Sequence, residues 1–150
     1  MGKLIAKKFF EEMTFFGGIA FYLFVIILLL IFEKLFFAFR LFLGLIIIYF
    51  IVFVIRLFYF KHRPKKIEHT NFLEKIDASS FPSVHAARIT FLFLFAIFLS
   101  GPDVVIKLIA GLVFLLVLYS RIYLFKHDLI DILGGVVVGA FAMLVFIIPL

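Results

Sequence analysis

The sequence predicts an all-α fold, a polytopic membrane helix bundle with about five transmembrane helices and an N-terminal interfacial helix. Hydrophobic residues make up 67% of the 150 residues, whereas a soluble domain is about half apolar. The apolar stretches are also continuous, which favours spanning helices over the alternating strands of a barrel. We therefore expect residues 1–150 to form a single integral-membrane domain.

The first 14 residues have the pattern of an amphipathic helix. Apolar side chains at Leu4, Ile5, Phe9 and Phe10 oppose lysines and glutamates. Such a helix lies in the plane of the membrane interface. Lysines beside a span commonly anchor the chain to lipid head groups.

Five apolar segments are long enough to be considered as spans. They cover residues 15–32, 35–60, 84–100, 104–123 and 129–150. Glu33 and Lys34 form the first turn, and the Gly-Pro-Asp sequence at 101–103 breaks the chain before the fourth span. Gly135 and Gly139 are four residues apart in the last span, a spacing that lets two membrane helices approach closely.

The polar residues are expected to gather on one face of the membrane. Segment 61–83 joins the second and third spans, and segment 121–128 joins the fourth and fifth, so both lie on the same face. The four histidines also fall there: His62, His69, His85 and His127. We expect a functional site at this end of the bundle.

Basic residues in these two segments suit a phosphate group. Arg56 and Arg63 are seven residues apart, which is two helical turns, so both can point the same way before Pro64 ends the helix. Arg121 lies at the end of the fourth span. Because the guanidinium fork matches phosphate oxygens, these arginines indicate an anion site.

Two histidines add the chemistry of phosphoryl transfer. His85 lies in the first turn of the third span, where helix N–H groups bind anions and an imidazole can protonate a leaving oxygen. His127 and Asp131 are four residues apart and share a helical face if the fifth helix starts near His127. A carboxylate that accepts one imidazole N–H leaves the other nitrogen free to attack.

These segments resemble the three signature motifs of the type 2 phosphatidic acid phosphatase superfamily, K-x6-R-P, P-S-G-H and S-R-x5-H-x3-D. This chain has Arg56-x6-Arg63-Pro64, Pro82-Ser83-Val84-His85 and Ser120-Arg121-x5-His127-x3-Asp131. The third motif matches in full. Arginine replaces the lysine of the first motif, and valine replaces the glycine of the second, which makes the pocket wall bulkier.

The resemblance implies a role for each matching residue. His127 resembles the nucleophile that forms a phosphohistidine, Asp131 the carboxylate that orients it, and His85 the general acid. The implied phosphate-binding residues are Arg56, Arg63, Ser83, Val84 and Arg121. The family works without a metal, so we expect no metal and no cofactor. It usually has six spans, one more than we expect here.

The implied function is hydrolysis of a membrane lipid phosphate monoester or diphosphate. The substrate is left open among an isoprenoid diphosphate, phosphatidylglycerol phosphate, phosphatidate and lipid A 1-phosphate. One alternative is a lipid-to-lipid phosphotransferase, and another is a non-catalytic lipid-phosphate-binding protein, which would need the arginines but no nucleophile. The expected partners are the substrate and the bilayer, with no nucleic acid; the oligomeric state is open.

Other polar residues have simpler interpretations. Arg40 is expected to snorkel towards the interface. Arg88, one turn past His85, is a candidate for support of the site residues, for head-group contact or for anchoring. His62 and His69 are expected to have no catalytic part. The positive-inside rule assigns the basic face to the cytoplasm, but several basic residues there are site residues. We expect a cytoplasmic-membrane protein with its active site on the extracytoplasmic face, as the resemblance implies.

Overall fold

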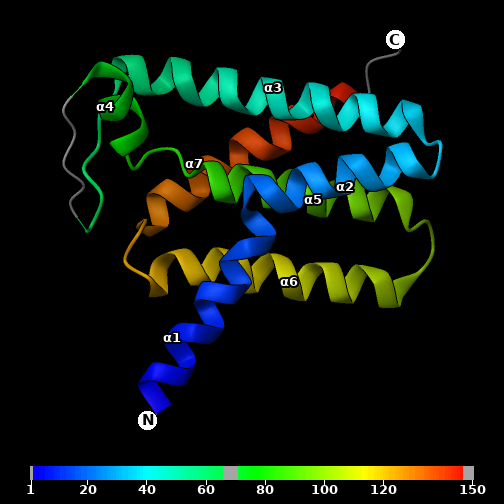
Figure 1. The fold of residues 1–150 in the computed structure, drawn as a ribbon, viewed down its shortest axis with the longest axis horizontal. Coiled ribbons are helices and arrows are strands. Elements are labelled where there is room, and N and C mark those ends of the chain that lie inside the picture. The colour runs from blue at the N-terminus through cyan, green and yellow to red at the C-terminus, as the bar shows by residue number, and fades with distance from the viewer. Residues whose placement is uncertain (1, 66–70, 147–150) are drawn as a thin grey trace.

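The computed structural model describes residues 2–65 and 71–146 and shows a bundle of helices in that part of the chain (Figure 1). The long helices lie side by side, and α1 leaves the bundle at an angle. The all-α bundle predicted from the sequence is confirmed. The elements are α1 (Gly2–Met13), η1 (Thr14–Gly17), α2 (Ile19–Ile31), α3 (Leu35–Phe58), α4 (Phe72–Ala78), α5 (Val84–Leu99), α6 (Val104–Tyr123), α7 (Leu129–Ala142) and η2 (Met143–Phe146).

Fewer helices than expected have the length of a full span. Within residues 2–65 and 71–146, three are long and apolar enough to cross a membrane: Leu35–Phe58, Val104–Tyr123 and Leu129–Phe146. The pair Gly2–Gly17 and Ile19–Ile31, bent by 46°, makes a fourth if it is one broken span. Helix α5 has only 16 residues, because it begins at the buried Ser83 inside the bundle rather than at its surface.

Glycine permits the close packing of the segment just before α2. A Cβ atom at Gly17 would lie 2.9 Å from the Val117 side chain and 3.3 Å from the carbonyl oxygen of His85, so η1 packs tightly against α5 and α6. Beyond the bend, α1 rests on α6, with the Phe10 ring 4.5 Å from that of Tyr123. No residue of α1 is buried, in keeping with the amphipathic helix that the sequence predicts.

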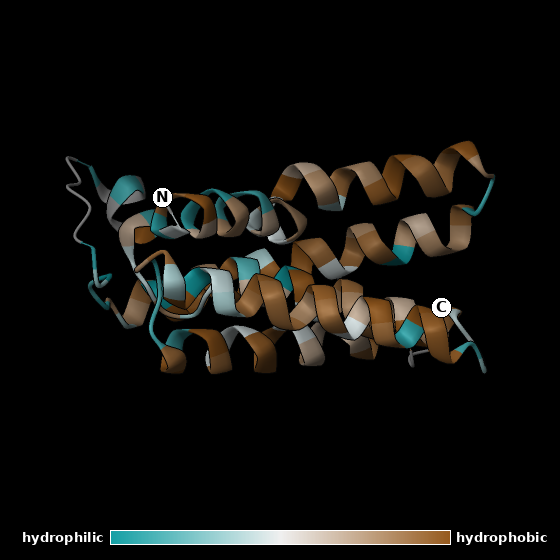
Figure 2. Ribbon diagram, turned by 90° about the horizontal axis from the view of Figure 1, so that it is seen from below, coloured by the Kyte–Doolittle hydropathy of each residue, from teal (hydrophilic) through white to brown (hydrophobic). Residues whose placement is uncertain are grey.

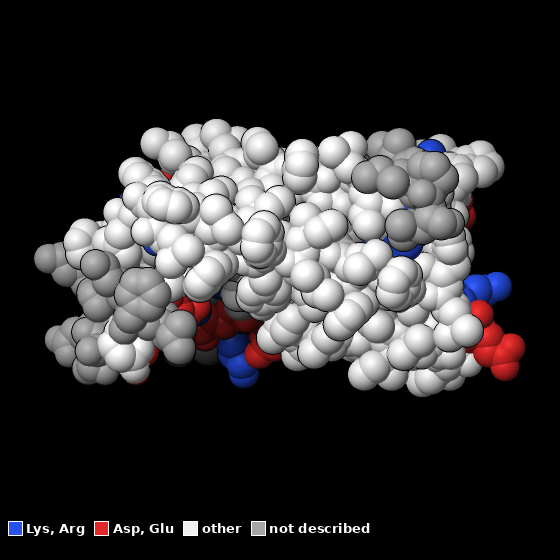
Figure 3. All heavy atoms as spheres, turned by 90° about the horizontal axis from the view of Figure 1, so that it is seen from above, with Lys and Arg blue, Asp and Glu red and all other residues white. Residues whose placement is uncertain are grey.

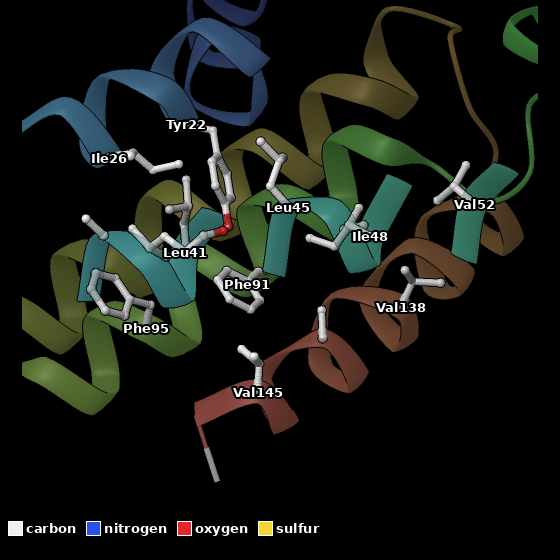
Figure 4. Packing of buried hydrophobic residues seen from close by; sticks show 14 residues of the cluster. Tyr22, Ile26, Leu41, Leu45, Ile48, Val52, Phe91, Phe95, Val138 and Val145 are labelled. Atoms are coloured by element: carbon white, nitrogen blue, oxygen red, sulfur yellow. Dashed lines mark hydrogen bonds between the residues drawn. The ribbon is translucent and has the colours of Figure 1, made fainter. Parts of the chain in front are cut away.

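The apolar core lies between α2, α3, α5 and α7 (Figure 4). Tyr22 is fully buried there, and its hydroxyl donates to the carbonyl oxygen of Leu41 at 2.9 Å, so burial leaves no unpaired polar group. Phe91 fits against the backbone of α3 because position 44 is glycine.

Close packing of α5 on α7 sets the geometry of the site. A Cβ atom at Gly135 would lie 2.4 Å from the carbonyl oxygen of Ser83, and one at Gly139 would lie 2.3 Å from that of Ala87. The close approach predicted from this glycine spacing is therefore present. Its partner is α5, the helix that begins beside His85, so the second and third motifs are held together.

The polar residues gather at one end of the bundle, as expected. The α3–α5 and α6–α7 connections share that end (Figure 1), where hydrophilic residues are concentrated (Figure 2). Away from the ends, the face in Figure 3 is largely uncharged. The α3–α5 connection also contains α4, which was not predicted; the Asn71 side chain caps it by accepting from the N–H of Glu74 at 2.9 Å.

Polar residues outside the three motifs have different surroundings. The snorkelling of Arg40 is wrong: this side chain is buried, lies 4.4 Å from the Phe36 ring and donates to the carbonyl oxygen of Val145. Carbonyls at a helix end lack intrahelical donors, and Arg40 supplies one. His62 is exposed, whereas His69 lies outside the described residues.

Candidate active site

A cavity of about 260 Å³ lies at the polar end of the bundle. Six of the eight site residues predicted from the sequence line it, namely Arg56, Arg63, Val84, His85, Arg121 and His127. The other two, Ser83 and Asp131, are buried behind its wall. The remaining lining residues are Tyr49, Asp77, Arg88 and Lys126.

Ser83 holds the start of α5 in place. Its hydroxyl accepts from the N–H of Ala86 at 3.4 Å, and its own N–H donates to the carbonyl oxygen of Asp131 at 3.0 Å. The N–H groups of Val84 and His85 have no partner within the helix, as at any helix start. Because these two residues line the cavity, the positive end of α5 faces it.

His127 is joined to Asp131 through a serine that the sequence analysis missed. Nδ1 of His127 lies 3.6 Å from Oδ2 of Asp131, too far for a good hydrogen bond. The Ser80 hydroxyl oxygen lies 3.3 Å from Nδ1 and donates to Oδ2. Because its hydrogen is used in the bond to the carboxylate, the hydroxyl oxygen can accept a hydrogen bond from Nδ1–H. The unprotonated Nε2 is then free for chemistry.

Lys61 is the second residue that the sequence analysis missed. Its Nζ lies 2.8 Å from Oδ1 of Asp131 and 2.6 Å from Oδ2 of Asp128. Asp131 is fully buried, so its charge needs such a partner. Burial alone would lower the pKa of Lys61, but the hydrogen bonds and charges of the two aspartates outweigh it and raise this pKa.

The surroundings keep His127 uncharged. Burial lowers the pKa of His127 to about 3, and the positive charges of Arg121 and Arg63 act in the same direction. The charge of Asp131 opposes them but does not prevail. At neutral pH the imidazole is therefore neutral, which is the form that can attack an electrophile.

The arginines combine structural bonds with unused donors. Arg56 donates to the carbonyl oxygens of Ile76 at 3.2 Å and Pro82 at 3.0 Å, and Arg63 donates to that of Asp77 at 2.7 Å. Both fasten the segment around α4 to the cavity. In the part of the chain that the structure describes, four cavity arginines keep a buried Nε–H without a partner: Arg56, Arg63, Arg88 and Arg121.

The charge of the cavity wall indicates an anion. The cavity wall carries four arginines and Lys126, opposed there by the single carboxylate of Asp77. A tetrahedral oxyanion such as phosphate matches this charge.

Arg88 fixes the proton of His85. Its guanidinium lies 3.3 Å from Nδ1 of His85 and donates to the hydroxyl of Tyr49 at 2.9 Å. A guanidinium can only donate, so Nδ1 is the acceptor and the ring proton sits on Nε2. A neutral imidazole with Nε2–H can donate a hydrogen bond to an oxygen in the cavity. Arg88, whose role was open from the sequence, lies in the cavity wall.

The family model of the PAP2 superfamily matches residues 37–148. The chain belongs to the PAP2 superfamily. This agrees with the resemblance to the type 2 phosphatidic acid phosphatases seen in the motifs. The matched region contains every site residue discussed above, whereas α1, η1 and α2 lie outside it.

Two solved structures share this PAP2 fold. LpxE from Aquifex aeolicus has a TM-score of 0.76 and 24% sequence identity, with 95% of this chain and 86% of that chain covered. A PAP2 type phosphatidylglycerolphosphate phosphatase from Bacillus subtilis has a TM-score of 0.70 and 23% identity, with coverages of 95% and 73%. No curated protein sequence matches the chain closely enough to count as a relative.

Proposed function

We propose that this membrane protein is a lipid phosphatase that hydrolyses a phosphate monoester or diphosphate through a phosphohistidine intermediate. One observation carries the proposal: two histidines with opposite proton arrangements line the same arginine-rich cavity. Nε2 of His127 is free because the Ser80 hydroxyl accepts a hydrogen bond from Nδ1–H. His85 carries its proton on Nε2 because Arg88 donates to its Nδ1.

The chemistry follows from these two nitrogens. With the phosphate held by the arginines, Nε2 of His127 attacks phosphorus and the bond to the leaving oxygen breaks. To act as the general acid, His85 takes up a second proton, on Nδ1 in place of the contact with Arg88, when the phosphate anion is bound. The imidazolium then gives its Nε2 proton to the leaving oxygen and becomes neutral. The neutral ring next takes a proton from the water that attacks the phosphohistidine, which regenerates the imidazolium of His85 and frees His127. Charge on the transferring group is stabilised throughout by fixed donors.

The comparisons support a lipid as the substrate. Family membership places the chain among PAP2 proteins, and one structural neighbour is described as a phosphatidylglycerolphosphate phosphatase. The neighbour's fold agrees with an enzyme that works at the membrane surface. The substrates that we consider remain an isoprenoid diphosphate, phosphatidylglycerol phosphate, phosphatidate and lipid A 1-phosphate.

Phosphate release from these lipids by the detergent-solubilised protein tests the proposal. Wild type should release phosphate, and His127→Ala should lose turnover while staying folded, because the phosphohistidine cannot form without this imidazole. Acid-labile phosphoprotein should accumulate in rapidly quenched wild type and not in His127→Ala. Substantial activity in a folded His127→Ala protein would contradict the mechanism. A wild type that binds these lipids but never hydrolyses them would indicate a non-catalytic lipid-phosphate-binding protein.

We also propose that the site opens on the extracytoplasmic face of the cytoplasmic membrane. Supporting this, Lys61 pairs with Asp131 and Lys126 lines the cavity, so neither should be counted as a topology signal. The chain has no cysteine, which permits labelling of single-cysteine variants at exposed positions. An impermeant thiol reagent added to intact cells should label His62→Cys and not Lys34→Cys; the reverse pattern would place the site in the cytoplasm.

A further inference from the structure

A second cavity adjoins the catalytic one and has no part in the chemistry described above. It measures about 340 Å³ and is lined by Lys7, Glu11, Thr14, Lys65, Leu124 and Lys126. Lys126 lines both cavities. Between them runs the hydrogen bond from Arg121, which faces the catalytic cavity, to the hydroxyl of Thr14, at 2.7 Å. The second cavity therefore begins where the proposed phosphate site ends.

The second cavity is positively charged. It has three lysines and one glutamate, and Glu11 lies 3.8 Å from Lys7. Within residues 2–65 and 71–146, no carboxylate lies within 4.0 Å of Lys65 or Lys126. Burial lowers the pKa of Lys126, and the charges of Arg121 and Arg63 lower it further. An anion beside Lys126 would relieve this repulsion.

A third cavity continues outwards from the second. It measures about 720 Å³, shares Lys7, Lys65 and Leu124 with the second, and adds Lys3 and the apolar side chains of Ile122 and Phe125, with Tyr123. From the catalytic cavity outwards, the lining residues thus change from arginines and histidines to lysines, and then to apolar side chains edged by lysines. A lipid that carries a second anionic group between its reacting phosphate and its tail has the same order of groups.

We propose that the middle cavity binds a second phosphate group of the substrate, on the tail side of the phosphate that reacts. This inference rests on the proposed phosphatase function and narrows its substrate. The enzyme then prefers lipids with two neighbouring phosphates to lipids with one phosphomonoester. Both an isoprenoid diphosphate and phosphatidylglycerol phosphate carry such a pair, directly joined in the first and separated by glycerol in the second, whereas phosphatidate carries none.

Two pairs of lipids with matched tails test the preference. One pair is farnesyl monophosphate and farnesyl diphosphate; the other is phosphatidate and phosphatidylglycerol phosphate with the same acyl chains. For wild type, kcat/KM should be about tenfold or more higher for the two-phosphate member of at least one pair, as expected for one added charge-assisted contact. The pair with the larger ratio identifies the spacing of the two phosphates. A ratio near one in both pairs would overturn the proposal.

Variants then assign the preference to the second cavity. Lys65→Met and Lys126→Met should reduce the two-phosphate preference about tenfold, again the size of one charged contact, whereas Lys107→Met, at the opposite end of α6, should keep it. Equal losses on both members of a pair would show that these lysines only attract lipid in general, and the proposal would be wrong.

Binding separates this inference from the phosphatase proposal. Equilibrium dialysis with His127→Ala, which has no nucleophile, should give tighter binding of farnesyl diphosphate or phosphatidylglycerol phosphate than of the matched monoester, and Lys65→Met in that background should remove the difference. If no lipid is turned over but the binding preference persists, the phosphatase proposal fails and the second phosphate site stands. Turnover without any preference in rate or binding gives the opposite result.

Discussion

The hydroxyl oxygen of Ser80 lies 3.3 Å from Nδ1 of His127. The same hydroxyl donates to Asp131, whose carboxylate is too far from the imidazole to hold it directly. The nucleophile proposed here is therefore oriented through a serine, from a segment that precedes the second motif.

Ser80→Ala should lower kcat much more than it raises KM. Without the hydroxyl, nothing accepts Nδ1–H and the ring loses its fixed tautomer; losses of an orienting partner span about 10- to 10⁴-fold. Ser80→Thr, which keeps a hydroxyl, should restore part of the rate. The matched control is Ser79→Ala, a buried serine whose hydroxyl bonds to backbone at Lys61 and Phe81. Equal losses at both positions would mean that Ser80 is only structural.

Loss of the cavity arginines should weaken the transition state. Arg63→Ala and Arg121→Ala should each lower kcat/KM by an amount equivalent to about 3 kcal/mol, as for loss of a preorganised donor. Arg40→Met is the control, because Arg40 is also a buried arginine but bonds to Val145 outside the cavity. Its stability should fall while its kinetics stay near wild type. If all three variants lose activity to the same degree, the losses report folding and not contact with phosphate.

Activity should persist in excess EDTA and be inhibited by vanadate. Arginines and the start of α5 supply the positive charge, whereas the carboxylates of Asp128 and Asp131 are already engaged by Lys61. Vanadate adopts the five-coordinate geometry of the phosphorus that His127 attacks and should bind more tightly than phosphate. Inhibition constants for both anions, measured with and without chelator, check this. Turnover that is lost with EDTA and restored by magnesium would contradict the proposed chemistry.

Gly139→Ala should destabilise the protein and reduce its activity. The new methyl group would meet the carbonyl oxygen of Ala87 at 2.3 Å, so α5 and α7 must move apart, at a cost of about 1–3 kcal/mol. That movement also separates His85 from His127. Gly111→Ala is the matched control, since its methyl group would lie 3.8 Å from Phe93, an ordinary contact. Thermal unfolding in detergent should show a lower midpoint for Gly139→Ala only.

Stability should depend on pH through His127. Its pKa is lowered from 6.5 to about 3 in the folded protein, so the unfolded chain binds more protons between these values. The free energy of unfolding therefore rises with pH across this window and falls as the pH drops below 6.5. His127→Gln removes the group, so its unfolding midpoint should fall less than that of wild type between about pH 6.5 and 4.5. Parallel loss in both proteins would contradict the assigned pKa.

The sequence by itself determined the class of fold, several helix boundaries and the residues of the three motifs. Span 104–123 was predicted with the ends that the structure shows, because a mostly apolar run is bounded by Gly-Pro-Asp and by a polar segment. The nearness of His127 to Asp131 was also readable from their spacing of four residues. The shared helical face was not found, because α7 begins at Leu129 and Ser80 joins the two side chains. Signals of this kind are local: they depend on composition and on spacing along the chain.

Only the tertiary structure decided how the motifs are completed. Lys61 and Asp131 are 70 residues apart, and Arg88 meets Tyr49 across 39. Ser80 and Lys61 belong to none of the three sequence motifs, so no motif spacing could select them. These contacts exist because α5 and α7 approach to backbone distance at Gly135 and because the segment around α4 folds back over the cavity. Burial of Asp131 then makes its two distant partners necessary, since a buried carboxylate requires compensation that only neighbours in space can supply.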